Sequence, residues 1–182
     1  MTALSGSSSQ EQRPKATILI APYGHVSKVL ALRNVTHVVS ILGAMDRLSW
    51  PSVGNRTAIR LAFDDASYSS GELVAPSQKH IADLINFARH WNSAGIILVH
   101  CRAGTSRSPA AAMIVAAVLE RMDVAQQILD GKAYFRPHQG MLRLADAELK
   151  STPRLADLVR SKPGRGDAEA LEVSAYSLAR PG

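Results

Sequence analysis

The sequence predicts a single α/β domain in which a central, mostly parallel sheet is flanked by helices. Ile96, Ile97, Leu98 and Val99 form an uninterrupted branched apolar run, typical of a strand covered on both faces of a parallel sheet. Segments with strand character alternate along the chain with segments of helical spacing, as in parallel-rich α/β proteins. A chain of 182 residues is long enough to bury one sizeable core.

The first half of this domain is expected to contain three strands and the first of its helices. Residues 1–15 are rich in Ser, Gly and Gln and predict a flexible lead. In residues 24–33, Val26, Val29 and Leu30 recur at helical spacing. Strands are expected over 17–20, 35–42 and 57–63, and loops over 43–54 and 66–75.

The second half is expected to be mainly helical around the apolar strand. Ser77 is expected to be the N-cap of a helix with an apolar stripe from Ile81 to Trp91, which Gly95 closes. Asp123 is expected to be the N-cap of a helix through Leu129. Residues 108–121 would form a helix that is apolar on nearly every face, which predicts that it is buried. A further helix is predicted over residues 140–150. Gly, Pro and charged residues dominate from 161 on. We therefore expect a domain over 16–160 and a loosely ordered tail over 161–182.

A short segment between the apolar strand and the buried helix carries the chemistry. Cys101 begins it, Arg107 ends it, and Gly104 allows a tight turn that directs backbone N–H groups inward. Pro109 is tolerated near a helix start, where its missing N–H has no helical partner. A concave row of amides at the positive end of a helix is well suited to hold an oxyanion.

The spacing of Cys101 and Arg107 fits phosphoryl chemistry. A loop curled around one phosphate can place the sulfur below phosphorus while the guanidinium grips two equatorial oxygens. The surrounding amides favour the thiolate, which is the nucleophilic form of cysteine. Cleavage of a phosphate ester also requires an acid that protonates the leaving oxygen.

These residues carry a family resemblance. His100-Cys101-x5-Arg107-Ser108 resembles the signature of cysteine-dependent protein tyrosine phosphatases, and the form His-Cys-Arg-x-Gly-x-Ser-Arg-Ser looks most like the dual-specificity branch. The run Phe63-Asp64-Asp65, then a helix and His100-Cys101, resembles compact bacterial members. The resemblance covers residues 16–149 and implies a phosphatase loop between the central strand and the buried helix.

The resemblance implies a role for each site residue. Asp65 would be the general acid and then the base, with Asp64 as the fallback, although both could simply cap the end of a strand. Ser108 would donate to the departing sulfur of Cys101. The phosphate oxygens would be bound along the loop by Arg102, Ala103, Gly104, Thr105, Ser106 and Arg107.

Two histidines are expected to support the loop. His100 is adjacent to Cys101 in a strand and should point to the opposite face, so we expect it to order the loop and tune the thiolate rather than act as a papain-like base. His138 stands where relatives often carry an Asn that buttresses the loop. The loop would then be supported differently, or be more sensitive to pH.

The function predicted from these features is metal-independent hydrolysis of phosphomonoesters in phosphorylated proteins or peptides through a phosphocysteine on Cys101. The substrate would be phosphotyrosine alone, or also phosphoserine and phosphothreonine. No cofactor is expected, and the other histidines lack metal-ligand spacing. The alternatives are a pseudophosphatase that binds phosphate without turnover, or a phosphatase of lipids or RNA 5′-phosphates. A rhodanese-like sulfur transferase fits less well.

Composition narrows partners and location. The net charge of +6 comes from scattered basic residues, which favours a solvated surface and a phosphate pocket over a nucleic-acid interface. The apolar run 110–119 is too short to span a membrane, and no secretory signal pattern is present. A lone cysteine allows no internal disulfide. We expect a cytoplasmic protein without membrane contact, and the oligomeric state stays open.

Overall fold

The structure is a computed structural model that describes residues 16–91, 93, 95–160 and 172–179. Its elements follow in chain order, with η1 and η2 denoting short 3-10 helices. They are β1 (Thr17–Pro22), η1 (Tyr23–His25), α1 (Val26–Leu32), β2 (Val35–Ile41), η2 (Ala44–Asp46), β3 (Thr57–Leu61), α2 (Gln78–Trp91), β4 (Ile96–Cys101), α3 (Arg107–Val118), α4 (Met122–Gly131), α5 (Gln139–Leu149), α6 (Leu155–Arg160) and β5 (Ser174–Ser177).

The sheet has five strands in the order β3-β2-β4-β1-β5. The first four strands of the chain pair in parallel, and β5 pairs antiparallel with β1 at one edge. The central position of β4 explains its continuous apolar run, because it is hydrogen-bonded on both sides and covered on both faces. The predicted α/β class with a mostly parallel sheet is confirmed.

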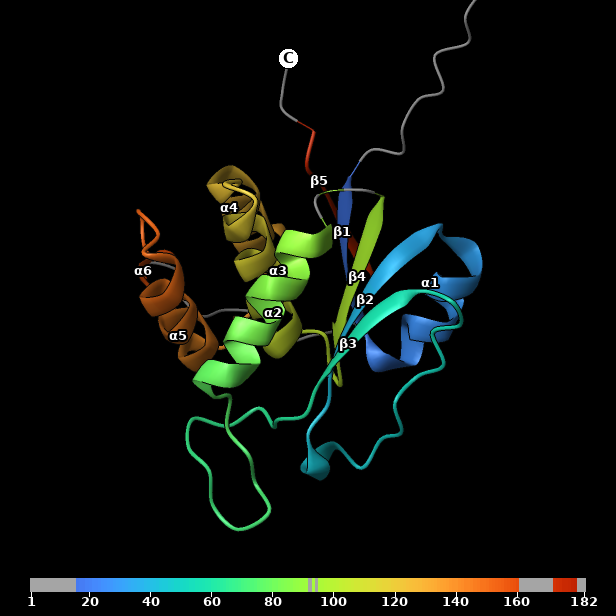
Figure 1. Ribbon diagram of the computed structural model, residues 1–182, viewed down its shortest axis with the longest axis horizontal. Helices are drawn as coiled ribbons and strands as arrows, with labels where there is room; N and C mark the ends of the chain where they lie inside the picture. The colour runs from blue at the N-terminus through green and yellow to red at the C-terminus, as the bar shows by residue number, and fades with distance from the viewer. Residues whose placement is uncertain (1–15, 92, 94, 161–171, 180–182) are drawn as a thin grey trace, which may run out of the picture.

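Helices cover the two faces of the sheet unequally (Figure 1). On one face, α1 packs its Val26, Val29 and Leu30 against Val38 and Leu98 of the sheet. On the other face, α2 to α6 build a much larger core around α3. Residues Arg107 to Ala116 of α3 are all buried, so the predicted buried helix beneath the loop is confirmed. Because it is enclosed, α3 holds its first residue in a fixed place.

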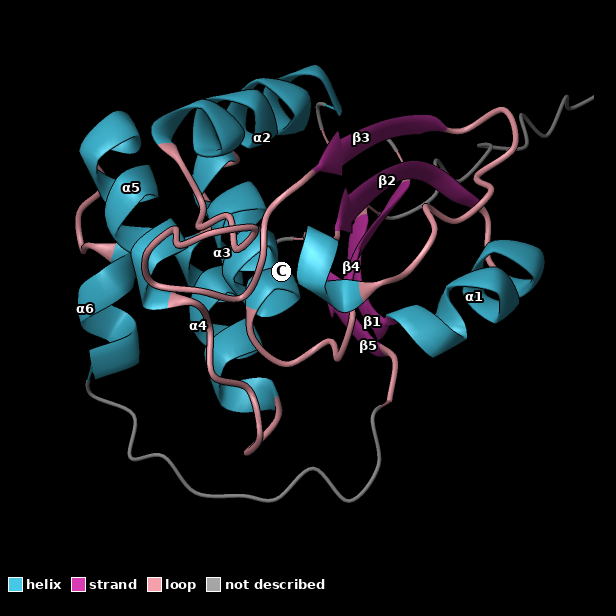
Figure 2. Cartoon of the chain, turned by 90° about the horizontal axis from the view of Figure 1, so that it is seen from below, coloured by secondary structure: helices cyan, strands magenta, loops and turns pink. Residues whose placement is uncertain are grey.

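The four parallel strands point the same way, so their carboxyl ends lie together at one end of the sheet. Figure 2 looks onto this end, where the loops that follow β2, β3 and β4 come together between α1 and the larger helical layer. The register places Pro22, the last residue of β1, beside Cys101, the last residue of β4. Ligands of open α/β sheets bind outside the carboxyl ends of the strands.

Several local predictions need correction. Part of the expected loose tail is a strand, β5, because Tyr176 and Leu178 are apolar and find a place in the core. The helix α6 was not predicted either, since six residues carry too little helical periodicity to stand out. Residues 1–15, 161–171 and 180–182, the remainder of the expected lead and tail, lie outside the described residues.

The two predicted N-caps have opposite outcomes. The Ser77 hydroxyl accepts from the His80 N–H at 3.4 Å just before α2, so this N-cap is confirmed. Asp123 lies inside α4, whose N-cap residue is Arg121. The Asp123 carboxylate accepts from the Arg121 guanidinium instead, at 2.7 and 2.5 Å. The N-cap prediction for Asp123 is therefore wrong, because α4 begins one residue earlier, at Met122.

No helix among the described residues combines the length and the apolar character that crossing a bilayer requires.

Candidate active site

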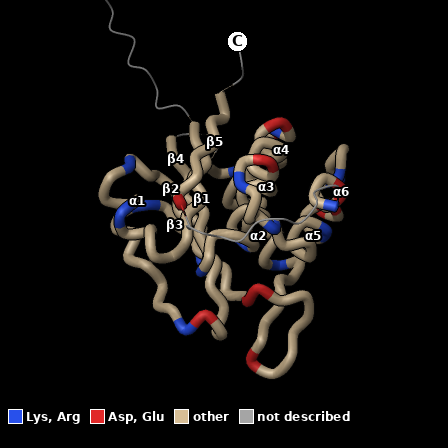
Figure 3. The backbone as a smooth tube through the Cα atoms, turned by 180° about the vertical axis from the view of Figure 1, so that it is seen from behind, with Lys and Arg blue, Asp and Glu red and all other residues tan. Residues whose placement is uncertain are grey.

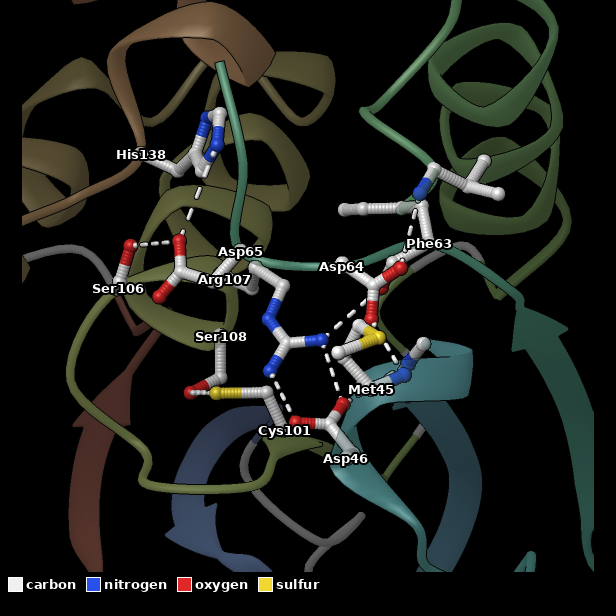
Figure 4. A network of polar contacts seen from close by, with 12 residues as sticks. Met45, Asp46, Phe63, Asp64, Asp65, Cys101, Ser106, Arg107, Ser108 and His138 are labelled. Carbon is white, nitrogen blue, oxygen red and sulfur yellow. Dashed lines mark hydrogen bonds and ion pairs between the residues drawn. The ribbon is translucent and has the colours of Figure 1, made fainter. Parts of the chain in front are cut away.

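Cys101 lies at the end of β4, at the floor of the loop that connects this strand to α3 (Figure 4). Its side chain is buried and makes no disulfide. Sγ lies 3.3 Å from the Ser108 hydroxyl and accepts from the Gly104 N–H, also at 3.3 Å. Two polar hydrogens that can stabilise negative charge on sulfur therefore converge on Cys101.

Glycine is required at position 104. Its φ of 78° lies in the left-handed region, which side chains disfavour. A Cβ built there would come within 2.9 Å of the Pro22 nitrogen, which belongs to the adjacent strand end. The tight turn and the close approach to β1 together allow the Gly104 N–H to point at the sulfur.

The loop is held from outside through its carbonyl groups. The Arg102 carbonyl accepts from the Tyr23 N–H at 3.0 Å, the Thr105 carbonyl from the Arg136 N–H at 2.8 Å, and the Ser106 carbonyl from the His138 N–H at 3.3 Å. In a trans peptide the N–H points opposite to the C=O. Carbonyls bound on the outside thus turn the following amides toward the centre of the loop, as an anion site requires.

Arg107 opens α3 and forms a two-pronged ion pair with Asp46. Its Nη1 and Nη2 donate to the two Asp46 carboxylate oxygens at 2.8 and 3.0 Å, and Nη1 also donates to the Phe63 carbonyl at 2.9 Å. Burial works against ionisation of both partners, yet their mutual hydrogen bonds prevail. The pKa of Asp46 is lowered and that of Arg107 is raised, the latter also by negative charge on Cys101.

One edge of the Arg107 guanidinium remains available. Asp46 and Phe63 occupy three of its five N–H groups. The buried Nε–H has no partner among the described residues. With the remaining Nη2–H it forms the two-donor edge that binds oxyanions in parallel hydrogen bonds. Asp46 therefore fixes the orientation of the guanidinium and leaves this edge for a ligand.

Asp64 and Asp65 occupy different environments although they are adjacent in the chain. Asp64 is buried, and its two carboxylate oxygens accept from the backbone N–H groups of Met45 and Val74, both at 2.9 Å. Its approach requires Gly43, where a Cβ would lie 2.0 Å from the Asp64 oxygen. Asp65 is exposed and accepts from the Ser106 hydroxyl at 2.8 Å (Figure 4). Ser106 belongs to the segment between Cys101 and Arg107, the predicted phosphate loop.

His138 links three parts of the site. Its Nδ1 accepts from the Met141 N–H at 3.3 Å and caps α5, which leaves Nε2 to donate to the Ala66 carbonyl at 3.0 Å. Nε2 also lies 3.8 Å from the Asp65 carboxylate. The His138 side chain thus holds the loop that carries Asp65, and its backbone N–H holds the phosphate loop.

His100 is completely buried beneath the site. Its Nε2 lies 2.7 Å from the Ser40 hydroxyl of the neighbouring strand β2. Burial lowers the pKa of His100 to about 4, so the ring is neutral at pH 7. Ser40 and His100 are paired in register, so the ring links β4 to β2 beneath the loop, and its expected role in ordering the loop and tuning the thiolate stays a prediction.

Of the predicted residues, the structure brings Cys101 and Ser108 together, and Asp65 close to Ser106 and His138. Asp64 and His100 face other partners.

Asp46 and Ser40 are contacts that the sequence analysis missed. Both lie at or just after the end of β2. One feature of the sequence could have pointed to Asp46. It follows a parallel strand, so it lies at the same carboxyl end of the sheet as Cys101. Its partner could not be read from the chain, since Arg107 is 61 residues away. Across the described residues, no cluster of three or more His, Cys, Asp or Glu could hold a metal ion.

Comparison of the sequence with protein-family models and with curated proteins finds no match. Solved structures do match. Human tyrosine phosphatase-like serine/threonine/tyrosine-interacting protein superposes with a TM-score of 0.57 at 19% identity, over 72% of this chain and 89% of that one. Human DUSP28 gives 0.55 at 14% identity, over 73% and 91%. PTPMT1, solved in complex with PI(5)P, gives 0.52 at 15% identity, over 76% and 94%. The chain therefore has the fold of the dual-specificity-phosphatase-like proteins.

Proposed function

We propose that this protein is a cysteine-based phosphomonoester hydrolase that acts on phosphorylated proteins or peptides. The observation that carries the proposal is the convergence on one loop of the Cys101 sulfur, the open edge of Arg107 and the carboxylate of Asp65. A nucleophile, an oxyanion clamp and a proton donor are the groups that phosphate-ester cleavage requires.

In the first step, the Cys101 thiolate attacks phosphorus and a sulfur–phosphorus bond forms. The ester oxygen departs with the bonding electrons and takes the proton of the Asp65 carboxylic acid. Arg107 and the loop amides from Arg102 to Arg107 bind the equatorial oxygens as charge builds on them. Asp46 acts as a positioning residue that keeps the guanidinium in place.

In the second step, water attacks the phosphocysteine and gives its proton to the Asp65 carboxylate. The sulfur–phosphorus bond breaks, inorganic phosphate forms, and Cys101 leaves as the thiolate. The hydroxyl of Ser108, 3.3 Å from the sulfur, can donate to this thiolate and make it a better leaving group. The cycle returns Asp65 to its acid form, and it is balanced without a metal or cofactor.

Phosphoproteins are favoured over the alternative substrates. The variable loop positions Ala103 and Thr105 carry no charge to select a lipid headgroup. Basic positions are spread over helices and loops of the described chain, rather than gathered into the stripe expected for RNA (Figure 3). A sequence with one cysteine, which can form no internal disulfide, suits a cytoplasmic location.

The test is hydrolysis of an aryl phosphate in the presence of a chelator by the full chain and by Cys101→Ser. We expect turnover by the wild type, none above background by the variant, and phosphorus bound to Cys101 in rapidly quenched wild type. Wild-type activity retained in Cys101→Ser would refute the mechanism. Retention of a phosphopeptide by the wild type with no product in a single turnover would identify a pseudophosphatase instead.

A further inference from the structure

The hydroxyl of Ser106 makes a contact that its position in the fold does not require. Ser106 is the N-cap residue of α3, a position that favours Ser because its oxygen can accept from a backbone N–H of the first turn. The Ser106 side chain makes no such capping bond. It donates instead to Oδ1 of Asp65 at 2.8 Å, from a position 41 residues along the chain. The hydroxyl therefore serves the loop that carries Asp65 rather than its own helix.

Ser106 is the rigid partner in this contact. Its carbonyl accepts from the Ala110 N–H at 3.2 Å, inside α3, and from the His138 N–H at 3.3 Å. The next residue, Arg107, begins a helix that is buried from its first position. The Asp65 side chain, in contrast, is 45% exposed, and a carboxylate with that much freedom rotates in solvent unless a neighbour holds it. The hydrogen bond thus fixes Asp65 against the loop.

The two oxygens of the Asp65 carboxylate have different surroundings. Oδ1 accepts from Ser106, and Nε2 of His138 lies 3.8 Å from the same oxygen. Within the described residues no hydrogen bond reaches Oδ2, and Figure 4 draws no contact to it. A protonated carboxyl group has one O–H, and its carbonyl oxygen is the better acceptor. Oδ1 is therefore placed to accept, and Oδ2 is left to carry the proton.

We propose that Ser106 is a positioning residue that orients the general acid from within the phosphate loop. The proposal rests on the proposed function and specifies which oxygen of Asp65 transfers the proton. In the first step the Oδ2–H bond breaks, its electrons stay on Oδ2, and the proton goes to the departing ester oxygen. In the second step the attacking water returns a proton to Oδ2. Oδ1 keeps its hydrogen bond to Ser106 throughout, so the carboxyl group stays in place between the steps.

This role concerns the leaving group and not the binding of phosphate. Arg107, the expected clamp on the phosphate oxygens, is anchored by Asp46 rather than by Ser106. A misplaced acid slows the reaction most when the leaving oxygen is basic, because a weakly basic oxygen departs without a proton. Loss of the hydroxyl should therefore slow substrates with basic leaving groups selectively. Since the Ser106 side chain makes no capping bond, its replacement by Ala takes no hydrogen bond from α3.

The experiment measures kcat/KM on phenyl phosphate and on para-nitrophenyl phosphate, whose phenol is much more acidic, for wild type, Ser106→Ala, Asp65→Asn and the double variant. We expect Ser106→Ala to lower kcat/KM on phenyl phosphate by roughly 10- to 30-fold, the scale of a misplaced catalytic group. On para-nitrophenyl phosphate the loss should be no more than about 3-fold. The inhibition constant of inorganic phosphate should stay the same. In the Asp65→Asn background, Ser106→Ala should have little further effect, because it acts through that acid.

Ser151→Ala is the matched control. The Ser151 hydroxyl donates to the Asp146 carboxylate, also at 2.8 Å, between α5 and α6 and outside the candidate site. Its removal should leave the ratio of the two substrates at the wild-type value. An unchanged ratio in Ser106→Ala, weaker inhibition by phosphate, or a full further loss in the Asp65→Asn background would overturn the proposal and leave the proposed function intact. Absence of turnover by the wild type would refute the proposed function instead.

Discussion

At the scale of single residues, Asp64 and Asp65 show how one step along the chain separates two roles. Asp64 uses both carboxylate oxygens to hold the backbone of Met45 and Val74, so none of its oxygens is left to face a substrate. Asp65 reaches the rim of the phosphate loop through Ser106. The positions of the two carboxylates therefore indicate a structural role for Asp64 and make Asp65 the candidate acid.

We predict that Asp65→Asn lowers kcat on aryl phosphates by on the order of 10² to 10⁴, the usual contribution of a general acid. Asp64→Asn should instead lower the free energy of unfolding by about 1 to 3 kcal/mol, because an amide nitrogen cannot accept the second backbone N–H. The measurements are steady-state kinetics and urea unfolding of both variants. If Asp64→Asn has the larger kinetic effect and Asp65→Asn the larger effect on stability, the assignment within the pair is wrong.

His100 makes the stability of the fold depend on pH. Its pKa is about 4 in the folded protein because of burial, against 6.5 for an exposed imidazole. Below about pH 6.5 the unfolded chain binds a proton that the folded chain excludes, so stability is lost as the pH falls from 6.5 toward 4. We predict that this residue accounts for roughly 2 to 3 kcal/mol of lost stability between pH 7 and about pH 4.5.

Urea unfolding of the wild type and His100→Asn at the two pH values isolates the contribution of His100. Asn does not titrate, so the variant should lose correspondingly less stability on acidification, even if it is less stable at pH 7 without its Ser40 contact. Equal losses in the two proteins would show that another group carries the pH dependence.

At the scale of secondary-structure elements, the candidate site is held together by contacts in which a residue of one element orients a residue of another element. The short helix η2 ends in Asp46, which orients Arg107 at the first position of α3. The segment before α5 supports the phosphate loop with the backbone N–H groups of Arg136 and His138, and the loop after β3 with the His138 ring. The loop is therefore shaped by contacts with at least three separate segments.

We predict that Asp46→Asn lowers kcat/KM by on the order of 10- to 100-fold, the effect of a small misplacement of a catalytic group. An amide offers one acceptor and no charge, so Arg107 would lose its two-pronged anchor. In the proposed mechanism the guanidinium binds both substrate and transition state, so KM and the inhibition constant of inorganic phosphate should rise as kcat falls. A merely structural role would lower stability and leave the inhibition constant unchanged.

Asp123→Asn is the matched control for this variant. It removes a carboxylate from a second Asp–Arg pair, which joins Asp123 to Arg121 at the start of α4. That pair lies outside the candidate site, and the Asp123 side chain is 47% exposed. We expect its kinetics and phosphate inhibition to match the wild type.

At the scale of the whole molecule, the last described strand forms one edge of the sheet and covers β1. β5 pairs with the edge of β1 and buries Tyr176 at the large core. Leu178, which follows β5, is also buried there, and its carbonyl accepts a hydrogen bond from Arg121. An uncovered β1 would expose a row of unpaired backbone groups, which promotes association between chains. The C-terminal strand therefore contributes to stability and to solubility.

We predict that truncation after Arg160 lowers Tm by roughly 6 to 12 °C, corresponding to about 3 kcal/mol for the loss of two buried side chains. It should also increase the oligomer fraction in size-exclusion chromatography, because β1 becomes an open edge. Truncation after Ala179 is the control, since it keeps β5, and it should leave Tm unchanged. A truncation at Arg160 with wild-type Tm would mean that β5 contributes nothing to stability.

The sequence by itself determined the strand that ends at Cys101, the loop after it and the helix that begins at Arg107. Each is encoded locally, by the apolar run, by Gly104 and by the apolar residues of the helix. It also determined the mostly parallel sheet and placed two acidic residues after β3. The family resemblance already favoured Asp65 over Asp64, and the tertiary structure added the contacts that place Asp65 at the loop and bury Asp64. Only the tertiary structure decided that Asp46 orients Arg107 and that β5 pairs with β1. Each of these depends on contacts between residues distant in sequence, and neither propensity nor periodicity records such a contact.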